Sequence, residues 1–394
     1  NVESAVNGLL VQPARPSPKA NVLAGVLATA IGLEASAAVT TATKKILERD
    51  SNGRLAEWQL QSLVVLLDEL ARQQKFIEAA VDESAKDQAA DDLETAFGLA
   101  RKNIAATDVN DNVKTLSIEL LGRQTRPSEA DYKLIASGLS PNRSAEMQSS
   151  AVDALTRTSQ VQAAEIMLEN WNSHGPNLRA EILDALFARG TWTDTLLTAV
   201  ENNRVAASDI GAARRARLLK SKNPRVQERA AKLFAGTIDA DRAKVISQYQ
   251  PVLESLSAEG GTERGRAVFK QRCSACHRLD EVGNHVGPDL KGLTDKSPAH
   301  LLTSILDPNR AVEPKYLSYT AVTERGRIYN GVLADESGGS LTLLDAEGKK
   351  HAILRRDLDE LTASGKSLMP EGLEKDIDPA AMRDLLNYLQ QALK

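Results

Sequence analysis

The sequence predicts a mainly helical protein in two parts. Residues 1–257 read as a run of helices, and residues 258–394 as a second helical domain with an inserted β unit at 315–363. The first part is rich in Ala and Leu, and aromatic residues make up only 4% of the chain, which favours helix over sheet. Between Tyr316 and Thr362 the hydrophobic period changes to two, as in strands.

Length and charge limit the classes of function. A chain of 394 residues can form two or three domains with their own cores. The apolar content of 42% and charged content of 26% are ordinary for a soluble protein. The net charge of -4 gives no reason to expect a nucleic-acid partner.

The beginning of the chain predicts an arm followed by a packed helix. Pro13, Pro16 and Pro18 indicate a short arm and linker. The apolar run from Val22 to Leu33 is shorter than the ~20 residues needed to cross a bilayer, so we expect no membrane span in this chain. The sequence starts at Asn1 without a signal peptide, and we expect a processed form or a piece of a longer protein.

Four heptapeptides in the first part share an apolar-acidic-x-Leu core: 66–72, 117–123, 151–157 and 182–188. Their acids are Asp68, Glu119, Asp153 and Asp184, which gives intervals of 51, 34 and 31 residues. Two of these intervals approach the length of one helical hairpin. The pattern resembles HEAT repeats and predicts an irregular α-solenoid, in which each helix pair buries its apolar face on its neighbour. A plain helical bundle is the alternative.

The chain's only two cysteines lie in the run Cys273-Ser274-Ala275-Cys276-His277. This C-x-x-C-H spacing is typical of covalent haem attachment, because two thiols on one turn can each add to a vinyl group and the following histidine can ligate the iron. The alternatives are a redox dithiol or half of a zinc site. A tetrahedral zinc needs more Cys or His ligands, and no second cluster is present in the sequence.

The residues around this motif resemble a class I cytochrome c. Gly265 and Phe269 precede Cys273 at four-residue steps, so they share a helix face. In that family the glycine allows a C-terminal helix, here 379–393, to cross closely. Gly287-Pro288-Asp289-Leu290 resembles the Gly-Pro-x-Leu loop, which implies that the Pro288 carbonyl accepts a hydrogen bond from His277. The resemblance thus implies that Phe269, Pro288 and Leu290 take part in binding haem c.

The same resemblance implies Met369 as the second iron ligand, because it lies in a Ser-Leu-Met-Pro-Glu-Gly loop just before the final helix. A thioether is a soft ligand that suits haem iron. Met382 is the nearest rival, but its place on the final helix favours packing. Met147 and Met167 are predicted to fill the core of the helical part.

Met369 follows His277 by 92 positions, far more than in a minimal cytochrome c. The excess contains four short runs with strand character at 319–323, 328–333, 341–344 and 351–354. They predict a small meander or SH3-like barrel. We expect this insert to act as a structural cover or a docking surface.

The combination of C-x-x-C-H, Gly-Pro-Asp-Leu, Asp307-Pro308-Asn309, Tyr316, the β insert and Ser-Leu-Met-Pro resembles a haem-binding domain family found in planctomycetes. The likeness covers residues 261–394. In that family HEAT-like repeats often precede the haem domain, and a sugar-dehydrogenase-like β-propeller often precedes the repeats. The sequence contains no propeller pattern.

These resemblances imply electron transfer through a haem with His277 and Met369 as ligands. The implied setting is the periplasm or another extracytoplasmic space, and the implied partner is a redox protein or a fused dehydrogenase domain. We expect no substrate chemistry in this chain. The alternatives are a five-coordinate haem enzyme or gas sensor, and a repeat scaffold that binds a protein or polysaccharide.

Overall fold

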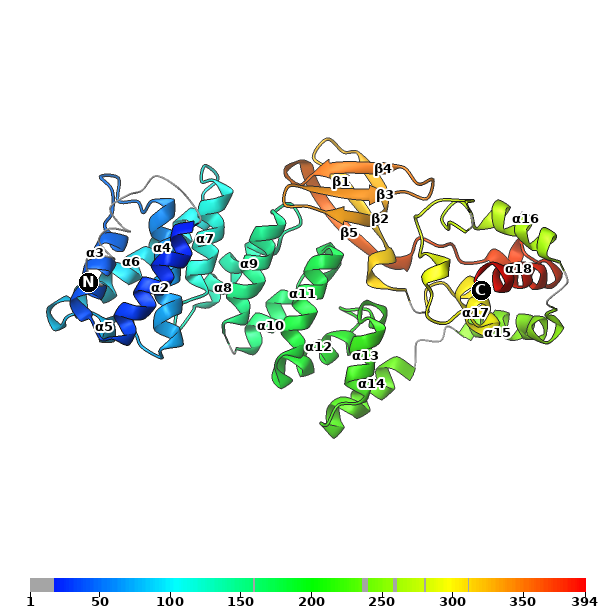
Figure 1. Ribbon diagram of the computed structural model, residues 1–394, viewed down its shortest axis with the longest axis horizontal. Coiled ribbons are helices and arrows are strands. Elements are labelled where there is room, and N and C mark those ends of the chain that lie inside the picture. Colours follow the sequence, from blue (N-terminus) through cyan, green and yellow to red (C-terminus); the bar gives the residue numbers. More distant parts are fainter. Residues whose placement is uncertain (1–17, 159, 236–239, 258–260, 280, 311) are drawn as a thin grey trace. The chain divides into compact units, whose positions relative to one another are not determined.

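The computed structural model describes residues 18–158, 160–235, 240–257, 261–279, 281–310 and 312–394. These ranges hold 17 α-helices, α2 to α18, and one five-stranded antiparallel sheet (Figure 1). The prediction of a mainly helical chain with a β unit in its C-terminal part is confirmed. The predicted N-terminal arm and most of the junction between 257 and 261 lie outside the described residues.

The chain divides into two compact units, which are described separately. The first unit comprises the residues up to 140 together with 146–167. The second unit comprises 141–145 and 168–394. The domain boundary that we expect at residue 257 stays a prediction.

The first unit is entirely helical in its described part. In α2 the apolar run packs Leu27 and Ile31 into the interior, where both are fully buried. No described helix combines the length and the apolar character needed to cross a bilayer. The helices are α2 (Pro18–Gly32), α3 (Ser36–Leu47), α4 (Glu57–Arg72), α5 (Ile77–Ala80), α6 (Lys86–Ala105), α7 (Asp111–Leu121), α8 (Glu129–Ala136), α9 (Ala145–Thr156, apart from its first residue) and α10 (Val161–Met167).

The repeated heptapeptides lie at the C-terminal ends of their helices, and two of their acids, Asp68 and Glu119, contact residues in or just after later helices. Asp68 accepts hydrogen bonds from Arg123 at 3.0 and 2.6 Å and forms an ion pair with Arg157 at 2.8 Å. Glu119 accepts a hydrogen bond from Ser150 at 2.8 Å. The shared acid therefore links neighbouring copies. The likeness to HEAT repeats stays a prediction.

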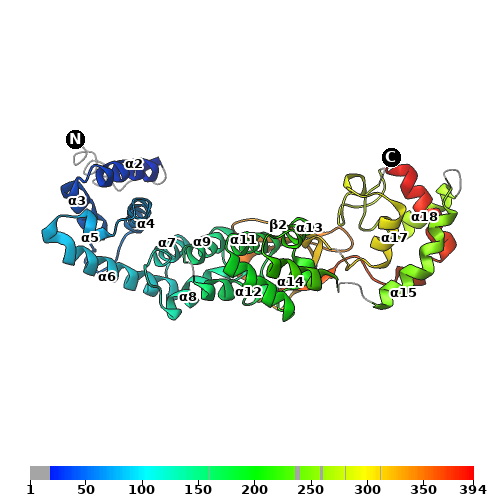
Figure 2. The ribbon, with the colours of Figure 1, turned by 90° about the horizontal axis from the view of Figure 1, so that it is seen from below.

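The second unit begins with four helices: α11 (Pro176–Phe187), α12 (Gly190–Glu201), α13 (Ala212–Leu219) and α14 (Pro224–Ala235). Figure 2 shows α11 and α13 in one layer and α12 and α14 in the other. Asp184 of α11 again bonds a later helix, because it accepts from Arg214 of α13 at 2.7 Å.

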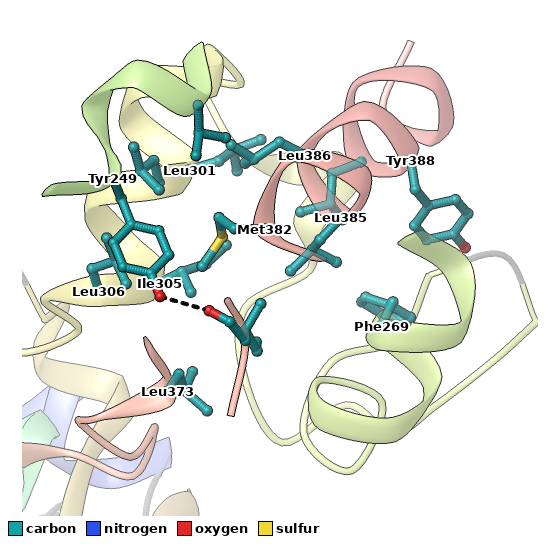
Figure 3. Close-up of a cluster of buried hydrophobic side chains, with 14 of the residues drawn as sticks. Tyr249, Phe269, Leu301, Ile305, Leu306, Leu373, Met382, Leu385, Leu386 and Tyr388 are labelled. Carbon is teal, nitrogen blue, oxygen red and sulfur yellow. Dashed lines mark hydrogen bonds between the residues drawn. The ribbon is translucent and has the colours of Figure 1, made fainter. Parts of the chain in front are cut away.

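Four further helices build the core of the cysteine-containing domain: α15 (Ala240–Tyr249), α16 (Thr262–Arg272), α17 (Pro298–Leu306) and α18 (Pro379–Ala392). Tyr249, Phe269, Leu306, Met382 and Leu385 belong to one buried apolar cluster (Figure 3). Helix α15 precedes residue 257, yet its Tyr249 packs into the same core as Phe269.

Helices α16 and α18 cross in close contact at Gly265, as the spacing of Gly265 and Phe269 predicts. A Cβ atom on Gly265 would lie 2.0 Å from the backbone oxygen of Asp384. One turn further on, the rings of Phe269 and Tyr388 lie 5.8 Å apart between centroids. The missing side chain thus lets the two backbones touch.

The β insert forms a sheet in the order β4-β3-β2-β1-β5. Its strands are β1 (Leu317–Thr323), β2 (Ile328–Glu336), β3 (Ser340–Leu344), β4 (Lys350–Leu354) and β5 (Leu358–Ser367). The first four match the predicted runs as a meander. The fifth was not predicted, because its sequence is polar and buries only Leu358, Leu361 and Ala363. It pairs antiparallel with β1.

Candidate functional site

The C-x-x-C-H run forms one compact turn at the end of α16. The Cys273 amide donates to the Phe269 carbonyl at 2.9 Å, and the His277 amide donates to the Cys273 carbonyl at 2.9 Å. Phe269, which is buried, anchors the helix that delivers this turn. Both cysteines are free thiols. The turn thus presents two thiols and one imidazole from five consecutive residues.

Burial shifts the pKa values of the two thiols in the direction opposite to that of a reactive dithiol. Burial, with a smaller contribution from Cys276, raises the pKa of Cys273 to about 12. Burial also raises the pKa of Cys276. Reactive dithiols instead have lowered thiol pKa values that favour the thiolate. Within the described ranges no group of three or more His, Cys, Asp or Glu side chains could hold a metal ion.

His277 is oriented by the following loop. Its Nδ1 lies 3.1 Å from the Pro288 carbonyl oxygen, the contact that the resemblance implied. A carbonyl can only accept, so Nδ1 carries the proton and Nε2 keeps its lone pair. Burial lowers the pKa of His277, although the Pro288 hydrogen bond acts in the opposite direction. A neutral imidazole with Nε2 unprotonated is the form that ligates iron.

Two glycines allow this loop to lie against the motif. A Cβ atom on Gly287 would lie 2.6 Å from Cε1 of His277, so only glycine leaves room for the ring. Gly283 has φ +98 and would place a Cβ atom 2.2 Å from the His277 carbonyl oxygen. The loop is fixed because the Val286 and Gly287 amides both donate to the Cys276 carbonyl, at 2.9 and 2.8 Å. The resemblance contained Gly287, but nothing in the sequence indicated the constraint at Gly283.

The other predicted residues gather at the core cluster of this domain. Cys273, Leu290 and Met369 are partly buried, and all three pack against it. Met382 is instead completely buried on α18, among Leu385, Ile305 and Leu306 (Figure 3). Met369 is therefore the better placed of the two methionines to reach a bound group. Its role as a ligand, like those of Phe269, Pro288 and Leu290 in binding, stays a prediction.

The residues present fit a covalently held haem. The required donor set consists of two thiols, an imidazole whose Nε2 is unprotonated, and a thioether. The thioether of Met369 packs against the same core cluster as Cys273. Cys273, Cys276 and His277 would hold the group, and the iron would supply one-electron chemistry. The chain itself supplies the apolar surroundings and the fixed imidazole.

The β insert packs against one side of the motif, and its expected role as a cover or docking surface stays a prediction. Val332 of β2 and Leu344 of β3 form a small buried cluster with Val286, and Cys276 packs against it. The Cys276 Sγ also lies 3.8 Å from the Ala346 carbonyl in the turn after β3. The alternation of apolar residues in β2 and β3 was visible in the sequence, but not the surface on which it packs.

The opposite end of the insert contacts α11 through buried charges. Glu336 of β2 forms an ion pair with Arg355 at 3.2 Å, with both side chains at most 6% exposed. The Glu336 carboxylate also accepts from the Asn177 amide at 3.2 Å. The Arg179 guanidinium lies over the ring of Tyr319 of β1 at 5.6 Å. Sequence reasoning could not find these contacts, because their partners are far apart in the chain.

Comparison with known proteins agrees with this geometry. Residues 262–322 match the family model "Cytochrome c". A curated relative, "Cytochrome c-553-like" from Synechocystis sp., is 29% identical over 66 residues, which is 16% of this chain. The match spans 62% of that relative's length. Residues 262–322 therefore form a cytochrome c domain, whose cofactor is haem c. Met369 lies beyond the matched residues.

Proposed function

We propose that this chain is an electron-transfer module in which His277 and Met369 are the axial ligands of the haem iron. The observation that carries the proposal is the position of Met369 against the cluster that also contacts Cys273 and Leu290. The Pro288 hydrogen bond prepares His277 for the opposite ligand position. Two permanent ligands leave no open coordination position, which favours a carrier over an enzyme or gas sensor.

The test is the visible spectrum of the oxidised holoprotein, which carries a weak long-wavelength band when a thioether binds the iron(III). We expect this band in the wild type and its loss in Met369→Ala. Met382→Leu is the matched control, because it conserves volume in the core, and should keep the band. A wild-type spectrum without the band would contradict Met369 as the second ligand and would remove the observation on which the carrier role depends.

We further propose that the helical part is a scaffold that holds the cytochrome c domain toward its electron donor. Support comes from the buried contacts of Glu336 and Tyr319 with the α11 region, together with the packing of Val332 and Leu344 against Cys276. One sheet thus touches both a helix of the repeat array and the haem-attachment motif. The HEAT-like character of the array and its likeness to the planctomycete family belong to this proposal.

The proposed donor is a dehydrogenase, either a partner protein or a further domain of the same polypeptide, in the periplasm or an equivalent space. We propose this location because haem c is attached to its two cysteines outside the bacterial cytoplasm. Cell fractionation tests it, since the haem-stained protein should separate with extracytoplasmic markers. Recovery with cytoplasmic markers would contradict the location.

A further inference from the structure

The segment that carries Met369 connects β5 to α18 and contains little regular structure. Residues 368–378 include only one short helical turn, Leu373–Lys375. At its beginning the segment is fixed by Asn309, whose Oδ1 accepts from the Ser367 amide at 2.8 Å. Asn309 Nδ2 also donates to the Glu371 carboxylate. A segment of this kind needs contacts from other elements to keep one conformation.

Helix α15 fixes the other end of this segment with a charged side chain. Arg242 donates to both carboxylate oxygens of Glu374, at 3.1 and 3.0 Å, and to the Leu306 carbonyl at 3.2 Å. The two side chains of the pair are only 16% and 13% exposed. The Arg242 hydrogen bond lowers the pKa of Glu374, so the carboxylate is charged at neutral pH. A bidentate pair of this kind restricts direction as well as distance.

Tyr249, at the end of the same helix, adds a second contact. Its hydroxyl donates to the Ile377 carbonyl at 2.8 Å, and the Glu374 carbonyl lies within hydrogen-bond distance of the same hydroxyl at 3.1 Å. Figure 3 shows one hydrogen bond of this hydroxyl as a dashed line. Burial raises the pKa of Tyr249, so the hydroxyl stays a neutral donor. The ring itself lies in the apolar core. Arg242 and Tyr249 therefore bond the same short turn from one helix.

The rest of α15 shows that these contacts are specific. Lys244 on the same helix pairs with Asp241 at 3.2 Å, and both side chains are at least 75% exposed. An exposed pair of this kind contributes little. The partly buried cation of α15 is thus the one directed at the segment between Met369 and α18.

We propose that Arg242 and Tyr249 are positioning residues that act as a latch, here called the α15 latch, on the segment carrying the axial ligand Met369. The inference rests on the proposed ligation by Met369. Helix α15 precedes the residues 262–322 that match the cytochrome c family, so the latch comes from outside the matched part. The latch keeps the segment closed and the thioether in place at the iron.

The physical effect is a shift in population. An added ligand binds only when Met369 has moved away, so its apparent affinity equals its intrinsic affinity multiplied by the open fraction. Weakening the latch raises the open fraction. A tenfold increase in that fraction corresponds to about 1.4 kcal/mol, and we expect an effect of this size for removal of the Arg242 charge.

The experiment is a titration of the oxidised, full-length holoprotein with imidazole, followed in the visible spectrum. Arg242→Gln should bind imidazole about tenfold more tightly than wild type, and Tyr249→Phe should show a smaller gain. Met369→Ala gives the limit of a fully open site. Lys244→Gln removes a charge from the same helix outside the latch and should bind as wild type does. Tyr249→Phe keeps the ring and serves if Arg242→Gln fails to fold.

Hydrogen exchange gives a readout that does not depend on the iron. The amides of Lys375, Asp376 and Ile377 bond within the latched turn, and they should exchange faster in Arg242→Gln than in Lys244→Gln. Wild-type exchange and wild-type imidazole affinity in both latch variants would overturn the latch while leaving Met369 as ligand. Equal imidazole affinity in Met369→Ala and wild type would overturn the proposed ligation and, with it, the role of the latch.

Discussion

The crossing of α16 and α18 predicts that Gly265→Ala is among the most damaging single-methyl changes in the cytochrome c domain. The new Cβ atom would lie 2.0 Å from the carbonyl oxygen and 2.6 Å from the carbonyl carbon of Asp384, and 2.8 Å from the Tyr388 Cβ. Carbon atoms in contact normally lie about 3.5–4.0 Å apart. The helices must therefore separate by more than an ångström, because backbone atoms cannot turn aside as a flexible side chain can.

The magnitude follows from what this separation disrupts. Overpacking by one methyl group typically costs about 1–3 kcal/mol, and a clash with backbone belongs at the upper end. The nearby ring contact of Phe269 and Tyr388 would add about 0.5–1.5 kcal/mol if it were lost. Together these terms give about 3.5–4.5 kcal/mol, and the ~1 kcal/mol advantage of alanine over glycine inside a helix reduces the expected loss to about 2.5–3.5 kcal/mol, a large part of the ~5–15 kcal/mol of a typical domain.

Urea unfolding of the oxidised holoprotein, followed through haem absorbance, measures this loss. The matched control is Gly98→Ala in α6, where a Cβ atom meets nothing within 4 Å. Glycine is about 1 kcal/mol less favourable than alanine inside a helix, so Gly98→Ala should stabilise the first unit. It should leave the unfolding of the cytochrome c domain, as followed by haem absorbance, unchanged. An unfolding midpoint for Gly265→Ala equal to that of wild type would refute the close-crossing argument.

Two further predictions concern buried charges. In the first unit, burial would raise the pKa of Asp131, but hydrogen bonds from Arg101 and Ser128 outweigh it and hold the value at about 2. A carboxyl group whose pKa is lower in the folded state stabilises the fold at pH values above its unfolded pKa, and this stabilisation is lost as the pH falls through the folded pKa. Asp131→Asn should therefore lower the free energy of unfolding by about 2 kcal/mol at pH 7 and flatten its pH dependence between about pH 4 and 2. In the second unit, Arg355→Met leaves Glu336 buried without its cation and should cost about 3–5 kcal/mol in denaturant unfolding. Arg356→Met, at a side chain that is 82% exposed, should change the unfolding free energy by at most about 0.5 kcal/mol; equal losses for the two would contradict the assignment of a buried pair.

Local spacing was sufficient to predict the parts of the site that lie close together in the chain. Cys273, Cys276 and His277 share one turn, and Gly265 and Phe269 share one helix face, so their relations depend on helix geometry alone. The Pro288 contact is also short in sequence. These features combine local backbone preference with a recognisable motif, and the comparison with cytochrome c supports the same interpretation.

Contacts between distant segments could not be predicted in this way. Arg242 and Glu374 are 132 residues apart, and both residue types are usually solvated on the surface. Strand β5 was missed for a related reason, since its polar sequence becomes a strand only through pairing with β1. In both cases tertiary context decides the structure, and one sequence without its fold contains little trace of that context.

The order of the strands explains how a long insert can precede the axial loop without displacing it. Leu317 near the start of β1 is paired with Ser367 at the end of β5, so the chain enters and leaves the sheet at neighbouring positions. The entropic cost of closing a long loop grows only slowly with its length. The pairing of β1 with β5 and the buried core of the sheet offset that cost. Met369 therefore follows the exit point by two residues, while Asn309 bonds the exit residue Ser367 at 2.8 Å. The residues of the insert thus add little to the path between the segments before and after it, because the fold brings both ends of the insert together.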